Sequence, residues 1–243
     1  MKNLSNIHSL PRAVSKLGYC SRSQAIELIT SGRVKVNSKI CLNPQRRVNL
    51  SKDKIEIDNQ PIKPTEKIYI ALNKPKGLVT TLHDERNRDT VYKCFENKIH
   101  TYNFPVGRLD KASEGLLLFT NDTDFAEKIL NPENHIEKTY HVQINKKLDD
   151  TIIDLIRKGV KDKNGEILAV KSIKILRIGQ KNCWVEIVLD EGKNRHIRRI
   201  FESLGIEVLR LIRIAIGNLE LGDLKKGEFR FLSEEDFWAL KNF

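Results

Sequence analysis

One aspartate stands in a setting that could support catalysis. Asp110 lies in the run Gly107–Gly115, with an Arg and a Lys close to it and a glycine at each end of the run. The apolar residues of Leu116–Phe119 follow directly and predict a buried strand. A carboxylate at the start of a buried strand can be fixed in position and kept ionised by neighbouring cations. Asp110 is therefore a candidate catalytic residue, although a lone Asp is commonly a helix cap or part of a surface ion pair.

A second group of candidate residues lies on a helix expected over Asn194–Leu204. Its apolar positions fall at i, i+3, i+4 and i+7 and make one stripe of Ile197, Ile200, Phe201 and Leu204. Arg195 and Arg199 then lie on the opposite face, with Arg198 at the flank, from which a guanidinium can reach a carboxylate. The alternative from the residues alone is a basic helix that faces RNA without a catalytic partner.

Four motifs, in order along the chain, resemble those of the bacterial rRNA pseudouridine synthases whose catalytic domain follows a small S4-type RNA-binding domain. The motifs are Lys-Pro-x-Gly at Lys74–Gly77, Gly-Arg-Leu-Asp within Gly107–Asp122, Lys-x-Tyr at Lys138–Tyr140 and a basic helix at Glu191–Arg199. The resemblance extends from about Leu10 to about Phe237. A single such motif would be weak evidence, but four in order after a matching front domain are specific.

This resemblance implies a reaction and the residues that carry it out. Such enzymes break the N1–C1′ bond of uridine, turn the base and rejoin it through C5. The carboxylate, Asp110 in this sequence, either attacks C1′ or removes a proton from C2′ to give a glycal. Arg198 corresponds to the arginine that pairs with this carboxylate and keeps it ionised at neutral pH. Neither route needs a cofactor or a metal ion, and we predict none.

Other positions of the motifs imply contacts with the RNA. Tyr140 corresponds to the aromatic residue that stacks on the target uracil, and Leu211 to an apolar wall beneath it. Arg108 corresponds to the side chain that fills the base stack after the nucleotide is flipped out. The remaining RNA contacts of the catalytic domain are expected from Lys74, Lys76, Arg195 and Arg199. From the residues alone, Tyr140 and Leu211 could also be core packing, and Arg108 a phosphate contact or an ion pair.

The positive charge of the chain is concentrated toward its N-terminal end. The 243 residues carry a formal net charge of +11, and Met1–Glu66 hold 12 Lys or Arg against 5 Asp or Glu. A small basic module before a nearly balanced larger one favours an RNA-binding domain joined to a domain with another task. By the resemblance, the RNA contacts of this front domain are Arg12, Lys16, Arg22, Ser23 and Arg33. A basic surface that only aids solubility is the alternative.

Residue patterning predicts an α+β chain of two domains. Residues 1–58 predict a module of helices followed by short strands, which the resemblance identifies as an S4-like domain, and Ser21 or Ser23 can cap its second helix. Residues 59–66 hold two prolines among polar residues and are expected to be a linker without regular structure. Residues 67–243 interleave strands and helices without strict alternation, which predicts a catalytic domain built on a mostly antiparallel sheet with flanking helices.

The predicted function is site-specific isomerisation of uridine to pseudouridine in ribosomal RNA. The Asn194-Arg195 pair and the run Leu209–Arg213 resemble the large-subunit members of the family, so we expect large-subunit (23S) rRNA, with small-subunit (16S) rRNA as the alternative. A non-catalytic RNA-binding or ribosome-assembly protein is a further alternative, against which the set Asp110, Tyr140 and Arg198 argues. A small-molecule enzyme is a third, but the sequence has neither a dinucleotide-binding fingerprint nor a P-loop.

The expected partner is ribosomal RNA or a ribosome assembly intermediate, bound by a monomer without a small-molecule cofactor. No apolar run is long enough to cross a bilayer, and Met1–Leu10 lack the features of a targeting segment, so we expect a cytoplasmic protein with no membrane partner. The cysteines are far apart and form no C-x-x-C pair, which predicts reduced thiols and no zinc site: Cys20, Cys41, Cys94 and Cys183.

Overall fold

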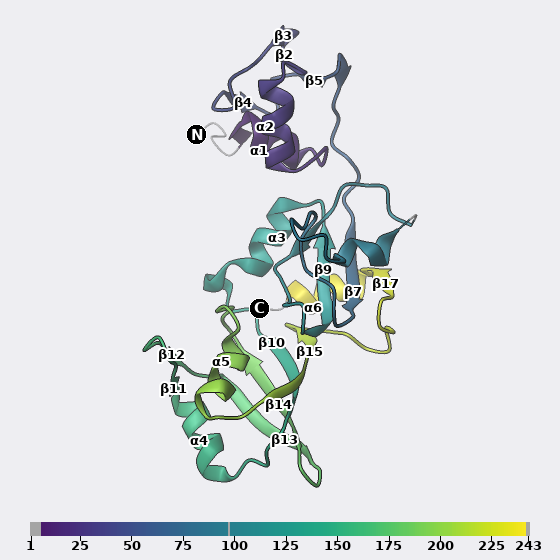
Figure 1. The fold of residues 1–243 in the computed structure, drawn as a ribbon. Helices are drawn as coiled ribbons and strands as arrows, with labels where there is room; N and C mark the ends of the chain where they lie inside the picture. The colour runs from purple at the N-terminus through teal and green to yellow at the C-terminus, as the bar shows by residue number, and fades with distance from the viewer. Residues whose placement is uncertain (1–5, 97, 242–243) are drawn as a thin grey trace. The chain divides into compact units, whose positions relative to one another are not determined.

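The structure is a computed structural model and describes residues 6–96 and 98–241. Its backbone contacts divide the chain into two compact units. The first unit takes in the described residues up to Ile68, together with His100–Phe104 and Thr120–Phe125, and the second unit takes in the rest. Figure 1 shows the elements of both units, coloured along the chain. The domain limits drawn from the sequence stay a prediction.

The first unit combines two helices with short strands (Figure 1). The helices are α1 (Leu10–Lys16) and α2 (Arg22–Thr30). The strands are β1 (Ile7–Ser9) paired with β4 (Arg47–Asn49), and a sheet in the order β3 (Lys39–Ile40), β2 (Val34–Val36), β5 (Ile55–Ile57) and β6 (Gln60–Pro61). Apolar side chains of both helices and of the strands form one core cluster, in which Ala13, Ile29 and Val34 are fully buried.

Local sequence explains how two of these elements begin. The Ser21 side chain accepts a hydrogen bond from the Gln24 N–H at 3.2 Å, and the Gln24 side chain accepts one from the Ser21 N–H at 3.1 Å, so a capping box starts α2. Strand β6 lies within the stretch expected to be an irregular linker. Asp58 and Asn59 adopt φ of 51° and 66°, which makes a tight hairpin turn and returns the chain onto β5.

The second unit is built on a nine-stranded sheet. Its main strands lie in the order β13 (Ser172–Ile178), β14 (Cys183–Leu189), β10 (Lys138–Ile144), β15 (Val208–Ile216), β9 (Glu114–Thr120), β7 (Tyr69–Lys74) and β17 (Phe229–Phe231), with β8 (Phe104–Val106) beside β9 and β16 (Leu219–Glu220) beside β15. The strands from β13 to β15 are antiparallel to their neighbours, whereas β9 runs parallel to β15. The predicted mostly antiparallel sheet is confirmed.

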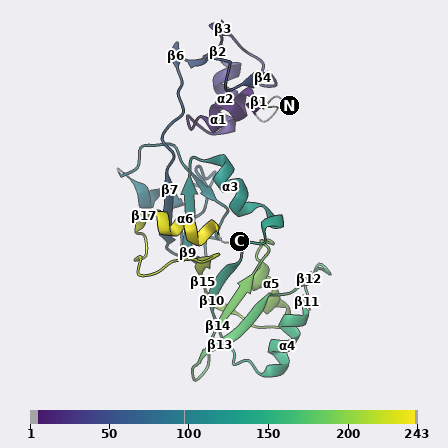
Figure 2. The ribbon, with the colours of Figure 1, turned by 180° about the vertical axis from the view of Figure 1, so that it is seen from behind.

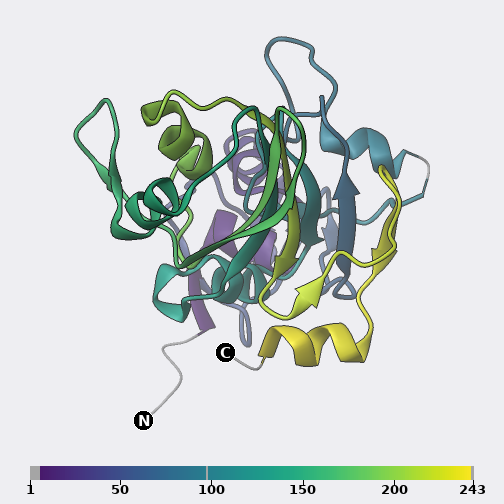
Figure 3. The ribbon, with the colours of Figure 1, turned by 90° about the horizontal axis from the view of Figure 1, so that it is seen from below.

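Two helices, α4 (Asp150–Lys158) and α5 (His196–Ser203), pack on one face of the part of the sheet formed by β13, β14, β10 and β15 (Figures 2 and 3). Ile156 of α4 and Phe201 of α5 are fully buried in the same core cluster as Val142 and Val185. The other elements of this part of the chain are α3 (Thr123–Leu130), α6 (Glu234–Lys241), the short hairpin β11 (Val160–Lys161) and β12 (Ile167–Leu168), and 3₁₀ turns at Val91–Phe95 and Pro132–Asn134.

In the second unit, the structure differs from the predicted elements in two informative places. Helix α5 begins at His196 rather than at Asn194, because Arg195 has a left-handed φ of 50° that interrupts the helix. Apolar runs and alternation predict strands at 68–72, 116–119, 140–144 and 185–189, which are observed as β7, β9, β10 and β14, but they predict no strand at the position of β13. Its pairing with β14 shifts register between Ile175 and Arg177, and such a bulge breaks the alternation by which a strand is recognised. In the part of the chain that the structure describes, no helix is both long and apolar enough to span a membrane.

Candidate active site

A cleft of about 540 Å³ lies within the second unit. Its walls come from the loop that joins β8 to β9, from β10 and β15, and from the β14–α5 connection, which we define as residues 190–195. The predicted site residues that line it are Arg108, Asp110, Tyr140, Arg195 and Leu211. Segments separated by up to about a hundred positions in the sequence therefore meet around one hollow.

Asp110 is placed by a loop whose backbone is held from several sides. The Thr80 hydroxyl donates to the Leu109 carbonyl at 2.7 Å, and the Gly77 N–H donates to the Lys111 carbonyl at 2.8 Å. Arg198 donates to the Ala112 carbonyl at 3.1 Å. With the Lys74 contacts described next, every carbonyl from residue 109 to residue 113 accepts a hydrogen bond. The Asp110 side chain itself remains 39% exposed, so a fixed backbone presents a carboxylate that a substrate can reach.

The structure corrects the role expected for Lys74. Its side chain is fully buried, and its Nζ donates to the carbonyls of Pro75, Asp110 and Ser113 at 3.1, 3.2 and 2.8 Å. An ammonium in this position fixes the Asp110 loop and cannot meet an RNA phosphate. Burial lowers the pKa of Lys74 to about 8, against an opposing effect of nearby Asp110. Lys76 is exposed, so its predicted RNA contact remains open.

The pKa of Lys74 predicts a pH effect on stability. Lys74 gives up its proton near pH 8 in the folded protein but near pH 10.5 in the unfolded chain, so the unfolded chain binds more protons between these values and stability rises with pH. The buried charge of Lys74 lowers the stability of the folded protein by its full amount below pH 8, and this destabilisation is absent above pH 10.5. From pH 7.5 to 9.5, we expect the free energy of unfolding of the wild type to gain about 2 kcal/mol relative to Lys74→Met in denaturant titrations.

The exposed Lys76 supplies the control for this measurement. Lys76→Met removes a lysine of the same motif whose side chain already faces solvent. The difference in unfolding free energy between wild type and Lys76→Met should therefore stay constant over the same pH range. A constant difference for Lys74→Met as well would show that Lys74 does not titrate as a buried group.

The second glycine of the Asp110 motif is explained by close backbone packing. Gly115 has a φ of 102° and pairs with Arg213 where β9 runs parallel to β15. A Cβ atom added at Gly115 would lie 2.2 Å from the Arg213 carbonyl oxygen, so no other residue fits without moving a strand. This packing connects the Asp110 loop directly to the strand that carries Leu211.

The arginine that forms an ion pair with Asp110 is Arg195, whereas the sequence predicted Arg198. A nitrogen of the Arg195 guanidinium lies 3.9 Å from an oxygen of Asp110. Arg198 instead uses its two terminal nitrogens to donate to the carbonyls of Ala112 and Val208. Burial lowers the pKa of Arg198, Arg195 adds to this effect, and Asp110 opposes it, so the charges of Arg198 and Asp110 still interact. Arg198 thus supports the backbone of the loop that carries Asp110.

The cleft is also lined by two cations that were not among the predicted site residues, Lys138 and Arg213. Lys138 lies two residues before Tyr140 on β10, and Arg213 is the β15 partner of Tyr140. Arg213 is buried, its Nε donates to the Leu116 carbonyl at 2.7 Å, and its Nη2 has no hydrogen-bond partner in the described structure. Burial lowers the pKa of Lys138, and Arg213 acts in the same direction. Both residues stand within stretches that carried the family resemblance, Lys138 in the Lys-x-Tyr motif and Arg213 at the end of the run Leu209–Arg213, but neither was assigned a role there.

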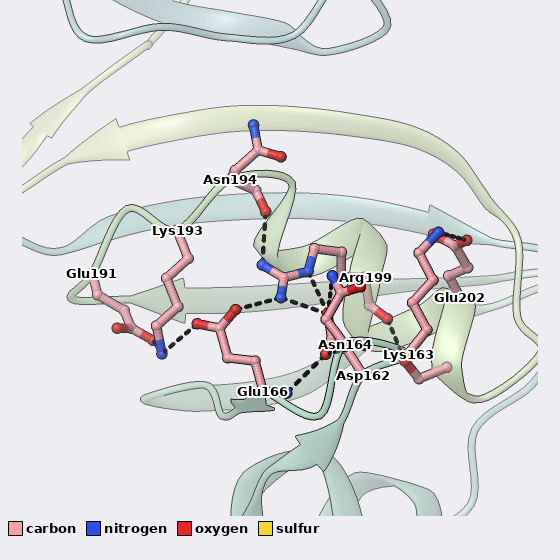
Figure 4. Close-up of polar contacts among 10 residues, drawn as sticks. Asp162, Lys163, Asn164, Glu166, Glu191, Lys193, Asn194, Arg199 and Glu202 are labelled. Carbon is pink, nitrogen blue, oxygen red and sulfur yellow. Dashed lines mark hydrogen bonds and ion pairs between the residues drawn. The ribbon is translucent and has the colours of Figure 1, made fainter.

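The structure also corrects the role expected for Arg199. Its side chain is only 15% exposed, and its guanidinium contacts Asp162 and Glu166 (Figure 4). Its remaining terminal nitrogen donates to the Asn194 carbonyl at 3.2 Å. Because this guanidinium is held by two carboxylates and a carbonyl, Arg199 is not an RNA-facing cation. Arg108 is exposed at the rim of the cleft, as a base-replacing side chain would have to be.

The residues proposed for RNA binding in the first unit lie on and around its helices. Arg12, Arg22 and Ser23 are exposed on α1 and α2. The Lys16 ammonium lies 2.8 Å from Asp124, and Arg33 forms a two-pronged ion pair with Asp58 at 2.8 and 2.5 Å. These surface pairs leave both cations partly exposed, so their contacts with RNA stay a prediction.

Comparison with known proteins agrees with this fold. The model of the RNA pseudouridylate synthase family matches residues 68–203, and the model of the S4 domain matches residues 10–55. An uncharacterized RNA pseudouridine synthase of Rickettsia conorii is 38% identical, over 94% of this chain and 98% of that protein. The ribosomal large subunit pseudouridine synthase B of Bacillus subtilis is 33% identical, over 96% of this chain and 95% of that protein.

Alignment with a solved structure supports the same fold. The crystal structure of a pseudouridylate synthase aligns with a TM-score of 0.66 and 27% identity, over 95% of this chain and 98% of that one. The fold and the cleft thus define an RNA-modifying enzyme with an S4 domain in front of its catalytic part. The chain belongs to the RNA pseudouridylate synthase family, as its motifs predicted.

Proposed function

We propose that this enzyme isomerises a specific uridine to pseudouridine in the RNA of the large ribosomal subunit, with Asp110 as the catalytic carboxylate. The observation that carries the proposal is the loop from residue 109 to residue 113, whose carbonyls are all hydrogen-bonded while the Asp110 carboxylate faces the cleft. The relatives of Bacillus subtilis and Buchnera aphidicola named ribosomal large subunit pseudouridine synthase B support the choice of RNA.

In the proposed reaction, each step is assigned to a residue of the cleft. Asp110 supplies the carboxylate that attacks C1′ or removes the C2′ proton, and the Arg195 guanidinium forms an ion pair with it at 3.9 Å. Tyr140 stacks on the freed uracil while it turns, above the apolar side chain of Leu211. Exposed Arg108 enters the base stack from which the nucleotide has been flipped. After the N1–C1′ bond has broken, the C5–C1′ bond forms as Asp110 leaves C1′ or returns the proton to C2′. N1 takes up a proton, and C5 releases its own proton to water.

Release of that proton provides the test. Ribosomal RNA is transcribed with uridine tritiated at C5, and tritium release is followed with large-subunit and small-subunit transcripts and with the corresponding assembly intermediates. Release from the large-subunit RNA alone is expected. Release only from small-subunit RNA would overturn the choice of substrate. Binding without release from any of them would favour a non-catalytic RNA-binding protein.

We further propose that the first unit binds the RNA through its helices, so that part of the affinity is electrostatic. Neutralising Arg12, Lys16 and Arg22 together to Gln should weaken RNA binding, and it should flatten the plot of log affinity against log salt concentration. The slope becomes shallower by about 0.7 to 0.9 for each phosphate that the protein no longer neutralises. Filter binding or fluorescence anisotropy over a salt series measures both quantities.

The matched control removes the same charge from the strand side of the unit. Lys39, Lys52 and Lys54 are exposed there, and their joint replacement by Gln lowers the net charge equally. Equal reductions of affinity in the two triple variants would mean that net charge, and not the helical surface, attracts the RNA.

The proposed function also implies a compartment and an oligomeric state. The cytoplasm, where ribosomal RNA is made and assembled in bacteria, is the compartment that this function requires. A monomer suffices because all proposed catalytic residues come from one chain.

A further inference from the structure

Beside the cleft lies an ion network that the reaction itself does not use (Figure 4). It starts on the hairpin of β11 and β12, whose connecting turn carries Asp162 and Glu166. Both carboxylates contact the guanidinium of Arg199 on α5, with Asp162 at 2.9 Å from Nε and 2.5 Å from Nη2. The Arg199 contacts lower the pKa of Glu166, so its carboxylate stays ionised at neutral pH.

The network continues from the hairpin into the β14–α5 connection. Glu166 lies 3.5 Å from the Lys193 ammonium, which also contacts Glu191 at 2.9 Å. Arg199 donates to the carbonyl of Asn194 at 3.2 Å. Glu166 therefore contacts the connection directly through Lys193 and indirectly through Arg199. Figure 4 shows its carboxylate between these two cations.

The segment held in this way is the one that presents Arg195 to Asp110. Arg195 follows Asn194 and adopts a φ of 50°, a conformation that side chains other than glycine rarely take. Its carbonyl accepts the first hydrogen bond of α5 from the Arg199 N–H at 2.8 Å, and its guanidinium points toward Asp110. A backbone in a sparsely populated conformation persists only when its surroundings hold it. In this protein, the contacts made by Arg199 and Lys193 hold the backbone of the β14–α5 connection.

We propose that Glu166 is a positioning residue, which holds the β14–α5 connection so that Arg195 stays beside Asp110 during the reaction. This inference rests on the proposed function, in which the reaction depends on the ion pair between Arg195 and Asp110. Asp162 is less suited to this role, since its other oxygen accepts from the N–H groups of Asn164 and Glu166 and so shapes the hairpin itself. The Glu166 side chain is 41% exposed and its contacts are with the two cations, so its removal should leave the hairpin folded.

Because Glu166 is negatively charged, its removal can distinguish a positioning role from a role in RNA binding. A carboxylate next to the cleft repels a polyanion, so removing it cannot weaken binding to RNA electrostatically. A lower rate in Glu166→Ala with equal or tighter RNA binding would therefore arise from the geometry of the site. Because misplacement of a catalytic group by about 1 Å can cost about 100-fold, we expect the single-turnover rate to fall about tenfold or more.

Glu202→Ala is the matched control. Glu202 lies on α5, is 57% exposed and pairs with Lys163 of the same hairpin at 3.4 Å. This variant removes the same charge near the same place, but Glu202 makes no contact with the β14–α5 connection in the described structure, so its rate and RNA affinity should match those of the wild type. An equal fall of the rate in Glu202→Ala, or an unchanged rate in Glu166→Ala, overturns the proposal.

Amide hydrogen exchange tests the same idea without relying on activity. In the full-length protein, peptides that cover residues 190–199 should exchange faster in Glu166→Ala than in the wild type or in Glu202→Ala, while peptides from β10 and β15 stay unchanged. Unchanged exchange at residues 190–199 overturns the proposal. If the wild type released no tritium from any RNA, the proposed function would fail, and the exchange comparison alone would decide whether Glu166 holds the connection.

Discussion

Asp110→Asn should abolish tritium release while leaving RNA bound. An amide has nearly the same shape as the carboxylate but can neither attack C1′ nor take the C2′ proton, and removal of such a group costs about 10³-fold or more. The loop backbone should be preserved, because the hydrogen bonds that hold residues 109–113 are made by carbonyls and not by the Asp110 side chain. Single-turnover tritium release and the dissociation constant for the RNA, measured on the same preparation, check both statements.

A second carboxylate controls for the general removal of a negative charge. Asp223 is exposed and does not line the cleft, so Asp223→Asn should retain the wild-type rate and affinity. Substantial release by Asp110→Asn would remove Asp110 from the chemistry and point to another group in the cleft. Loss of both RNA binding and tritium release would instead assign Asp110 to RNA binding.

Tyr140→Leu should slow the reaction about 10- to 100-fold. Stacking of an aromatic side chain on a base contributes about 1–3 kcal/mol, and leucine keeps apolar contact without the flat surface on which the uracil can turn. Tyr140 lies on β10 between Ile187 of β14 and Arg213 of β15, so its position is set by two neighbouring strands. Single-turnover rates on the large-subunit RNA measure the effect.

Tyr140→Phe separates the ring from the hydroxyl group. If the ring alone matters, phenylalanine keeps most of the rate that leucine loses. A fall of the rate in Tyr140→Phe as large as in Tyr140→Leu would assign the function to the hydroxyl group, for example in moving the C5 proton. Wild-type rates for both variants would place Tyr140 in the core and not in the reaction.

Much of the architecture could be predicted from the residues because it depends on local patterning. The apolar stripe of α5 and the unbroken apolar run of β9 indicate a helix and a buried strand regardless of their partners. Ser21 with Gln24 indicates the start of α2 for the same reason. Strand β13 was missed because its bulge is set by pairing with β14, which no local pattern records.

The candidate site, too, could be predicted from the sequence only in part. The resemblance of the motifs to the family was enough to select Asp110, Tyr140, Arg108 and Leu211, all of which line one cleft. It could not assign partners to the cations, because the sequence shows that a Lys or Arg is present but not which carbonyl or carboxylate its long side chain reaches. Lys74 was therefore expected at RNA phosphate, although it is buried beneath the Asp110 loop.

The sequence by itself determined the family, the order of the elements and the residue types available for the reaction, since these follow from motifs and periodicity along the chain. Only the tertiary structure decided that Arg195 pairs with Asp110, that Arg198 holds the loop backbone, and that Arg199 belongs to the network of Asp162 and Glu166. The three arginines are near neighbours in sequence. Successive positions around α5 face different segments, and the left-handed turn at Arg195 redirects the chain just before the helix begins.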